Sequence, residues 1–194
     1  MKILGGQLKG RNFYMPADIR PTQNLVRKAI FDVLGDVGGL EFLELFAGSG
    51  AVSFEALSLG AKSVTLIERD DHCLEVIREN MRLLKLDSFE NFQKSSLGLV
   101  ELITADIFPS IKQLALKKRK FDVIFVDPPF GHGLGKKTLK ALRAYDILHP
   151  NCFIIIQGEK NEILPSCEGR FLLVREKNYG ASQLSFYSSS NEFK

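Results

Sequence analysis

The order of apolar and polar residues along the chain alternates between two patterns. Short runs that are apolar at nearly every position, as in strands buried on both faces, are expected at 41–46, 63–68, 100–104, 121–126 and 152–157. Stretches with apolar residues at helical spacing lie before and between these runs, at 24–34, 49–59, 71–84, 109–117 and 136–145. Strands that alternate with helices in this way predict an α/β fold with a doubly wound, mostly parallel sheet.

The last part of the chain departs from this alternation. Two further strands are expected at 171–177 and 183–188, and only a turn at Gly180 separates them. A connection this short joins antiparallel strands, because parallel strands need a crossover of about a dozen residues or more. The complete sheet is therefore expected to have seven strands, with an antiparallel strand at the C-terminal end. Residues 85–99 show no readable period.

The N-terminal part precedes the alternating elements. It begins with a glycine-rich, irregular stretch in which a hairpin is expected around residues 5–10. Thr22 is a candidate N-cap for the helix that follows. We therefore expect two parts in the chain. A basic N-terminal hairpin and helix, residues 1–38, would pack on a larger domain formed by residues 39–194.

The composition is that of one well-buried domain, with 194 residues of which 45% are hydrophobic. No apolar run is long enough to cross a membrane, and the N-terminus lacks the apolar core of a signal peptide. The three cysteines and three histidines are dispersed, so neither a disulfide framework nor a metal site is expected. These features favour a cytoplasmic protein that holds no metal.

The net charge of +3 is unevenly distributed along the chain. Residues 1–30 contain six basic residues and one acid, Asp18, which gives them a charge of +5 and leaves −2 for the remainder. A basic arm on a slightly acidic body suggests a polyanionic partner that binds near the arm. A basic segment that is merely solvated explains the same excess, and the charge alone leaves both explanations open.

Candidate binding residues stand where the predicted strands end, since ligands of open α/β sheets bind beyond the carboxyl ends of the strands. The first strand runs into Glu44-Leu45-Phe46-Ala47-Gly48-Ser49-Gly50, whose glycines permit a tight turn and a close approach of a ligand. A dinucleotide fingerprint would need a third glycine at Ser53, and the P-loop pattern is absent too. A carboxylate at Glu44 would repel a pyrophosphate and attract an ammonium group. An ordinary strand-to-helix turn with glycines is the alternative.

The next two strand ends each carry an acid. Glu68 lies about 20 residues after the glycine turn, where an acid typically accepts hydrogen bonds from ribose hydroxyls. The alternative role, an N-cap for the following helix, suits Asp70 better. Asp106 follows the third strand and has two candidate roles. It would accept a hydrogen bond from an adenine amino group, or cap the next helix.

The fourth strand ends in Val126-Asp127-Pro128-Pro129-Phe130-Gly131. The prolines cannot donate to a sheet, so they end the strand and stiffen the loop in an extended conformation. Such a loop presents one acid, backbone carbonyls and one aromatic ring, which together can hold a small planar group. The four strand ends then describe a ligand with an amine, a ribose and an adenine, beside a site for a planar group. That ligand is S-adenosylmethionine.

These motifs also carry a resemblance to known enzymes. The ordered set ELFAGSG, IERD, AD and DPPF resembles the class I S-adenosylmethionine-dependent methyltransferases, which have a Rossmann-like fold. DPPF is similar to the (D/N)-P-P-(Y/F) loop of enzymes that methylate exocyclic or amide nitrogens. RPTQNLVRKAIFDVL, KILGGQLKGRNF and YGASQLSFY resemble the bacterial 16S ribosomal RNA (guanine(966)-N2)-methyltransferases. The chain departs from the wider class at Glu44, where many members have aspartate.

The resemblance implies roles for the matching residues. Asp127 would accept a hydrogen bond from the target amine, the Pro128 carbonyl would accept another, and Phe130 would stack on the base. The residues expected to bind S-adenosylmethionine are Glu44, Phe46, Ala47, Gly48, Ser49, Gly50, Glu68, Arg69, Asp106 and Ile107. Those of the N-terminal part expected to bind RNA are Lys2, Lys9, Arg11, Arg20, Thr22, Arg27 and Lys28. The expected partner is 16S ribosomal RNA or the small ribosomal subunit, and the expected form is a monomer.

Three other functions remain open on the sequence. An adenine-N6 methyltransferase shares the DPPF loop, but DNA enzymes of that type usually carry a target-recognition domain, for which 194 residues leave little room. A protein-glutamine methyltransferase would be expected to carry an additional N-terminal domain. The third is a non-catalytic RNA-binding module on a decayed methyltransferase fold. The intact acids at 44, 68, 106 and 127 argue against decay.

Overall fold

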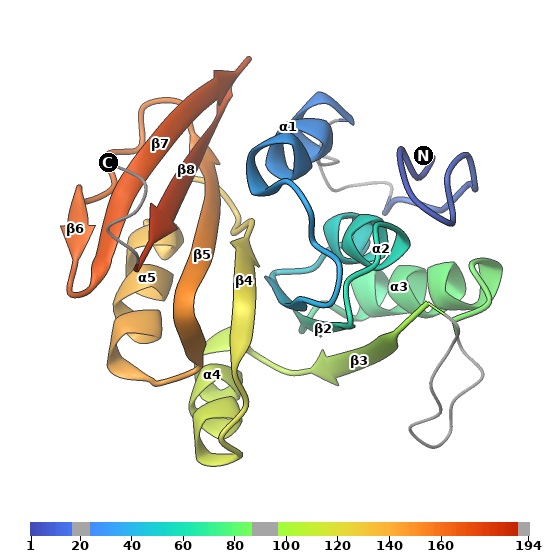
Figure 1. The fold of residues 1–194 in the computed structure, drawn as a ribbon, viewed down its shortest axis with the longest axis horizontal. Helices are drawn as coiled ribbons and strands as arrows, with labels where there is room; N and C mark the ends of the chain where they lie inside the picture. The colour runs from blue at the N-terminus through green and yellow to red at the C-terminus, as the bar shows by residue number, and fades with distance from the viewer. Residues whose placement is uncertain (17–23, 87–96, 190–194) are drawn as a thin grey trace.

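The structure is a computed structural model that describes residues 1–16, 24–86 and 97–189. Its centre is one eight-stranded sheet in the order β3-β2-β1-β4-β5-β8-β7-β6 (Figure 1). The strands are β1 (Glu41–Leu45), β2 (Ser63–Glu68), β3 (Leu99–Thr104), β4 (Phe121–Val126), β5 (Leu148–Glu159), β6 (Cys167–Glu168), β7 (Phe171–Tyr179) and β8 (Ser182–Ser188). The helices are α1 (Asn24–Leu34), α2 (Ala51–Ser58), α3 (Asp71–Leu83), α4 (Ile107–Leu116) and α5 (Leu134–Ala144).

The pairing of the strands confirms the predicted fold class. β3, β2, β1, β4 and β5 are parallel neighbours, and β8 joins β5 in the antiparallel direction. β7 pairs antiparallel with β8, as the short turn between them predicted. The sheet has one strand more than expected, because the two residues of β6 are too few to show a period. β1 ends at Leu45, one residue early, since Phe46 has a left-handed φ of 59°.

Helices cover both faces of the sheet, and residues two apart along a strand pack on the same face. Phe42 of β1, Val64 of β2 and Phe125 of β4 belong to a core shared with α1, α2 and α3. Leu43 and Ile124 alternate with them and pack with α4 and α5. This double cover explains why the central strands are apolar at nearly every position. Within the described ranges, none of the helices has the length and apolarity that a membrane span needs.

The N-terminal segment folds back on itself and packs on the same side of the sheet as α1 and α2. Ile3 donates a backbone hydrogen bond to the Arg11 carbonyl at 3.0 Å, so the chain between them turns as a hairpin. Ile3, Leu8 and Phe13 are buried in the core that contains residues of α1 and α2. The hairpin expected around residues 5–10 is therefore present, and its apolar side chains anchor it to the main body.

Arg27 holds this segment in place, and its predicted contact with RNA is wrong. The side chain has no exposed surface. Its Nη2 donates to the Lys2 carbonyl at 2.7 Å, and its Nη1 lies 3.7 Å from Glu55 Oε2. Glu55 also accepts hydrogen bonds from the backbone N–H groups of Leu4 and Gly5. A buried guanidinium has to be paired in this way. The charge of Arg27 therefore acts inside the protein, whereas the sequence analysis had assigned it to RNA.

Candidate active site

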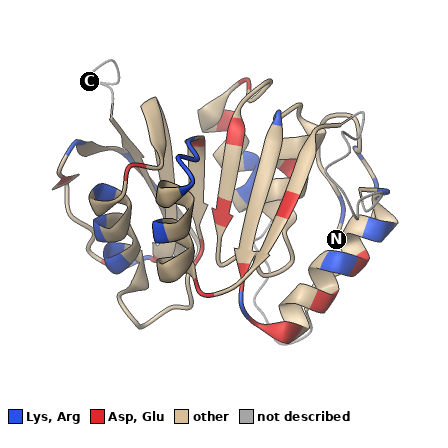
Figure 2. Cartoon of the chain, turned by 90° about the horizontal axis from the view of Figure 1, so that it is seen from below, with Lys and Arg blue, Asp and Glu red and all other residues tan. Residues whose placement is uncertain are grey.

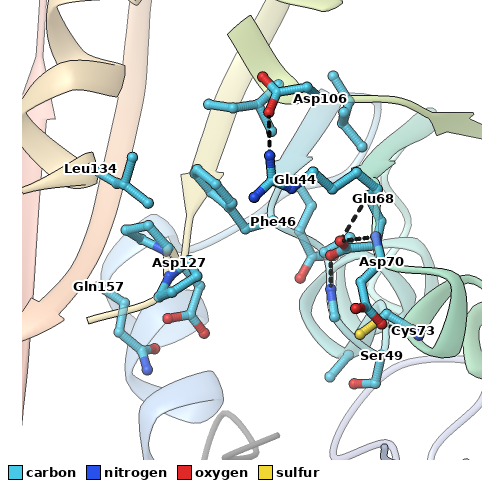
Figure 3. Close-up of a pocket in the computed structure, with 18 of the residues that line it drawn as sticks. Glu44, Phe46, Ser49, Glu68, Asp70, Cys73, Asp106, Asp127, Leu134 and Gln157 are labelled. Atoms are coloured by element: carbon cyan, nitrogen blue, oxygen red, sulfur yellow. Dashed lines mark hydrogen bonds and ion pairs between the residues drawn. The ribbon is translucent and has the colours of Figure 1, made fainter. Parts of the chain in front are cut away.

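A cleft with a volume of about 480 Å³ opens at the carboxyl ends of β1, β2, β3, β4 and β5 (Figure 3). Its walls are the ends of these strands, the loops that follow them and the first residues of α2, α4 and α5. The lining residues that were singled out from the sequence are Glu44, Phe46, Ala47, Gly48, Ser49, Glu68, Arg69, Asp106, Ile107, Asp127, Pro128 and Phe130. The structure thus brings the motifs of four strand ends into one site, whereas Gly50 stays outside the lining.

The loop between β1 and α2 needs its two glycines for different reasons. Gly48 and Gly50 both have left-handed φ angles, of 56° and 75°. A Cβ on Gly50 would lie 2.7 Å from the Phe54 ring and 2.8 Å from Leu66 Cδ2, whereas a Cβ on Gly48 would meet no atom within 4 Å. Gly50 is therefore required by packing, and Gly48 leaves open space in the lining of the cleft.

Glu44 lines the cleft and is 3% exposed. One of its carboxylate oxygens accepts a hydrogen bond from the backbone N–H of Ser53 in α2, at 2.9 Å. Burial raises the pKa of Glu44 to about 7, the contact with Ser53 opposes this rise, and the negative charge of Asp127 adds to it. A bound cation would stabilise the ionised carboxylate, so the site suits an ammonium group.

Glu68, at the end of β2, joins the glycine loop to its own strand. Its Oε2 accepts a hydrogen bond from Gly48 N–H at 2.9 Å, and its Oε1 accepts from the N–H groups of Arg69 and Asp70 at 2.7 and 2.9 Å. A carboxylate oxygen accepts about two hydrogen bonds, so Oε1 is fully used and Oε2 keeps one acceptor position. The carboxylate is therefore fixed in orientation and still able to accept a hydrogen bond from a ribose hydroxyl.

Two further acids that line the cleft act as N-caps of helices. Asp70 accepts a hydrogen bond from Cys73 N–H at 3.0 Å, which confirms its predicted role as the N-cap of α3. Asp106 caps α4 through Phe108 N–H at 3.0 Å and pairs with Arg69 at 2.8 Å. The cap, one of its two candidate roles, is thus confirmed. In the described ranges, His, Cys, Asp and Glu side chains form no group that could hold a metal ion.

The Asp127-Pro128-Pro129-Phe130 loop leaves the sheet at the end of β4. The Asp127 N–H still donates to the Leu45 carbonyl of β1, at 3.3 Å. Beyond it the two prolines have no N–H to donate, so the chain separates from the sheet. Pro128 is buried, and Asp127 and Phe130 are half-buried in the lining of the cleft. The loop therefore presents a carboxylate and an aromatic ring from a stiff support.

The cleft also contains residues that the sequence analysis did not assign to binding. They are Met15, Ala51, Ile67, Asp70, Cys73, Ala105, Pro129, Leu134 and Gln157. Gln157 could have been found, because the fifth strand was predicted to end at this residue. It stands beside Asp127, since the preceding residues Ile156 and Val126 pair across β5 and β4 (Figure 3). Met15 comes from an irregular segment, in which no pattern points to a site.

The residues expected to bind RNA are only partly within the structure. Those that it shows at the surface are Lys2, Lys9, Arg11 and Lys28. Arg20 and Thr22, with the expected helix cap at Thr22, lie outside the described residues. Met15, which follows the basic hairpin, lines the cleft. The exposed positive charges of the N-terminal part are therefore attached to a segment that reaches the candidate site.

Comparison with known proteins decides the family. The family model described as Conserved hypothetical protein 95 matches residues 1–188. The chain belongs to this family. The ribosomal RNA small subunit methyltransferase D of Haemophilus influenzae is 30% identical over 97% of this chain and 94% of that protein. The protein of the same name from Escherichia coli K12 is 31% identical over 96% of this chain and 89% of that protein.

Solved structures of similar proteins agree with this family. The Escherichia coli protein yhhF is 30% identical to the chain, with a TM-score of 0.81 over 97% of each chain. A hypothetical protein of Thermus thermophilus is 28% identical, with a TM-score of 0.79 over 96% of this chain and 98% of that chain. Family and relatives together confirm the prediction of a class I S-adenosylmethionine-dependent methyltransferase.

Proposed function

We propose that this chain transfers a methyl group from S-adenosylmethionine to the exocyclic N2 amine of a guanine in 16S ribosomal RNA. The observation that supports this most directly is the cleft, which Glu44, Glu68 and Asp106 line together with Asp127 and Phe130. An enzyme that brings a nucleoside-bearing cofactor next to a planar base needs both sets of groups in one site. Relatives that are named ribosomal RNA small subunit methyltransferase D favour RNA over DNA or protein as the substrate.

The residues of the cleft fit S-adenosylmethionine group by group. Glu68 Oε2 keeps an acceptor position for a ribose hydroxyl, and Glu44 suits the ammonium group. The open space at Gly48 lets the cofactor approach the backbone, and Asp106 and Ile107 line the cleft where the adenine would lie. When bound, the cofactor supplies a methyl group on a positively charged sulfur, ready for transfer to a nucleophile.

The protein has to position the guanine and stabilise the charge that forms on its amine. N2 is a weak nucleophile, because its lone pair is delocalised into the ring. The Asp127 carboxylate accepts a hydrogen bond from the amine, which orients it and stabilises the positive charge that develops on the nitrogen. The proton that the methylated nitrogen then loses passes to Asp127 or to water. The Pro128 carbonyl accepts the second N–H, and Phe130 stacks on the base. The stiffness of the proline loop serves this positioning.

The base also has to reach the cleft. In structured RNA, a base must leave its stack before it can enter an enclosed site. We infer that Lys2, Lys9 and Arg11 hold phosphates of the RNA during this step, because they are exposed and their segment leads to Met15 in the cleft wall. We place the protein in the cytoplasm with its RNA. We expect a monomer to act, since a single chain supplies both the cofactor residues and the base-binding loop.

The test is incubation of the protein with labelled S-adenosylmethionine and small-subunit particles that lack the modification, followed by nucleoside analysis. Label is expected in N2-methylguanosine. Label in N6-methyladenosine would replace the proposal with adenine methylation, which the same loop could support. Absence of label from the RNA would refute both. Asp127→Ala is the matched control, because it should bind the cofactor and transfer no methyl group.

A further inference from the structure

Gln157 is a buried polar residue in the cleft whose hydrogen bonds the protein does not complete. The residue is 5% exposed, and its Oε1 has no hydrogen-bond partner among the residues that the structure describes. A buried carbonyl oxygen without a partner is unfavourable and therefore calls for an explanation. Since Gln157 lines the cleft, a bound substrate is the natural source of the missing partner.

The position of Gln157 connects it to the reaction. Phe125 and Ile155 pair across β4 and β5, and both face the core that contains residues of α1 and α2. Two positions further on, Asp127 directly after β4 and Gln157 within the last residues of β5 lie on the same face. Figure 3 shows the two side chains next to one another in the cleft. A base whose amine is held by Asp127 therefore places its neighbouring edge atoms at Gln157.

We propose that the Gln157 carboxamide reads the Watson–Crick edge of the target guanine, with Oε1 accepting from N1–H and Nε2 donating to O6. The inference rests on the function proposed above. On guanine, N1–H adjoins the N2 amine and O6 follows it, so the edge offers first a donor and then an acceptor. A carboxamide carries the complementary pair. A half-turn about its last bond brings either of its polar atoms to either position.

The same contact would reject adenine. Adenine held by its N6 amine presents the lone pair of N1 and then C2–H. The carboxamide could donate one hydrogen bond to N1, and its oxygen would then face a carbon. Guanine satisfies both polar atoms of Gln157, whereas adenine leaves the oxygen unsatisfied. Because a site built to hydrogen-bond a substrate group rejects an analogue that lacks it, Gln157 makes the cleft selective for guanine.

A double-mutant cycle tests this contact. Particles carry either guanine or 2-aminopurine at the target position, because 2-aminopurine keeps the amine and lacks both N1–H and O6. For the wild type, kcat/KM on 2-aminopurine should be at least about tenfold lower than on guanine. Gln157→Leu should lower kcat/KM on guanine by a similar factor and show little further loss on 2-aminopurine. Equal discrimination by the variant and the wild type would overturn the inference.

Three controls make each outcome decisive. Gln157→Met is a second apolar variant, and both variants should bind S-adenosylmethionine like the wild type. Gln157→Glu keeps an acceptor and should retain most of the preference for guanine. If neither apolar variant folds, the wild-type ratio still decides, because a wild type that accepts 2-aminopurine as well as guanine has no such contact. A wild type that leaves guanine particles unmethylated contradicts the proposed function instead.

The charge of the surface beside the cleft is an independent observation. Residues 134–140 contain three lysines, Lys136, Lys137 and Lys140, and no acid. Figure 2 shows Lys and Arg on α4 and α5, and neither helix contains an acid. Leu134, the first residue of α5, lines the cleft, and the exposed Lys136 and Lys137 follow it.

We infer that Lys136 and Lys137 of α5 hold phosphates of the RNA. In Figure 1, α5 and the N-terminal hairpin lie on opposite sides of β4. The RNA backbone on either side of a base in the cleft would run over both surfaces. Lysine binds its phosphates as a point charge. No acid of the described residues pairs with either lysine within 4.0 Å, so both charges are available to a partner. This inference concerns RNA binding and can be measured without methyl transfer.

The chain contains a matched control for this surface. Lys117 and Lys118 are also adjacent and exposed, but they follow the far end of α4, about 15 Å along the helix from Ile107 in the cleft. Changing Lys136 and Lys137 to Gln should reduce the slope of log affinity for RNA against log salt by about 1.4. The same change at Lys117 and Lys118 should leave the slope unchanged. Equal slopes for the two variants would overturn the inference.

Discussion

At the scale of single residues, the buried carboxyl group of Glu44 makes the stability of the free protein depend on pH. Burial raises its pKa to about 7, while glutamate in an unfolded chain titrates near ~4.3. Between these values the folded state binds more protons than the unfolded chain. The free energy of unfolding therefore falls as the pH rises through this window, and the loss is complete above the folded pKa.

The change Glu44→Gln removes this dependence. Relative to the wild type, the variant should gain about 1–3 kcal/mol of unfolding free energy between roughly pH 5 and roughly pH 8. Urea denaturation of the cofactor-free proteins at the two pH values measures the difference. A difference between variant and wild type that does not change with pH would contradict the raised pKa of Glu44.

The two glycines of the loop after β1 give a matched pair of changes. Gly50→Ala brings a methyl group against Phe54 and Leu66 in a left-handed backbone, so the free energy of unfolding should fall by at least about 1–3 kcal/mol. Gly48→Ala meets no atom and should cost only about 1 kcal/mol for its φ, but it should weaken the binding of S-adenosylmethionine. Thermal unfolding and calorimetric titration separate the two effects. Normal cofactor binding by Gly48→Ala and by the bulkier Gly48→Val would remove this loop from the cofactor site.

At the scale of elements, the proline loop after β4 should separate binding from chemistry. Asp127→Ala is expected to keep the fold and most of the cofactor affinity but to lose methyl transfer, because the amine loses its acceptor. Phe130→Ala should retain partial activity with weaker binding of the base, since stacking contributes about 1–3 kcal/mol. Circular dichroism, calorimetric titration and single-turnover methylation measure the three properties. Near-normal turnover by Asp127→Ala would exclude the role proposed for the loop.

Most elements could be predicted because helices leave a helical period in the sequence, and strands covered on both faces leave a continuous apolar run. β2 and β4 have the predicted bounds, since helices bury both of their faces. The errors fall where local chemistry hides the pattern. Phe46 has an apolar side chain, as a strand residue would, but its left-handed φ ends the strand before it. β5 begins at Leu148, before its predicted start, because its first part includes the exposed Pro150 and Asn151.

At the scale of the whole molecule, the residues that escaped prediction depend on contacts between distant elements. Arg27 looks like a surface charge in any local pattern, and only Glu55 on another helix explains its burial. Gln157 lies beside Asp127 because β5 is the neighbour of β4 in the sheet. The period of a sequence does not show which strands are neighbours. Glu44 and Glu68 converge for a general reason, since parallel strands of one sheet end at the same edge.

The basic N-terminal hairpin can be tested as a whole against RNA. Because Arg27 is buried and Lys28 pairs with an acid of its own helix, the free charges of the described hairpin are Lys2, Lys9 and Arg11. Changing these three residues to Gln should weaken RNA binding. It should also make the slope of log affinity against log salt shallower by about 2, at roughly 0.7 per phosphate contact for single strands.

The same variant distinguishes an RNA-binding hairpin from a lid over the cofactor. None of Lys2, Lys9 and Arg11 lines the cleft, so the affinity for S-adenosylmethionine should stay at the wild-type value. A lid would give the reverse result, with weaker cofactor binding and an unchanged salt slope. Arg27→Gln is the contrasting change. Its guanidinium joins the hairpin to Glu55 inside the protein, so this variant should lower the free energy of unfolding. If Arg27→Gln instead changed the salt slope as strongly as the three exposed changes without loss of stability, the assignment of charges to surface and interior would be wrong.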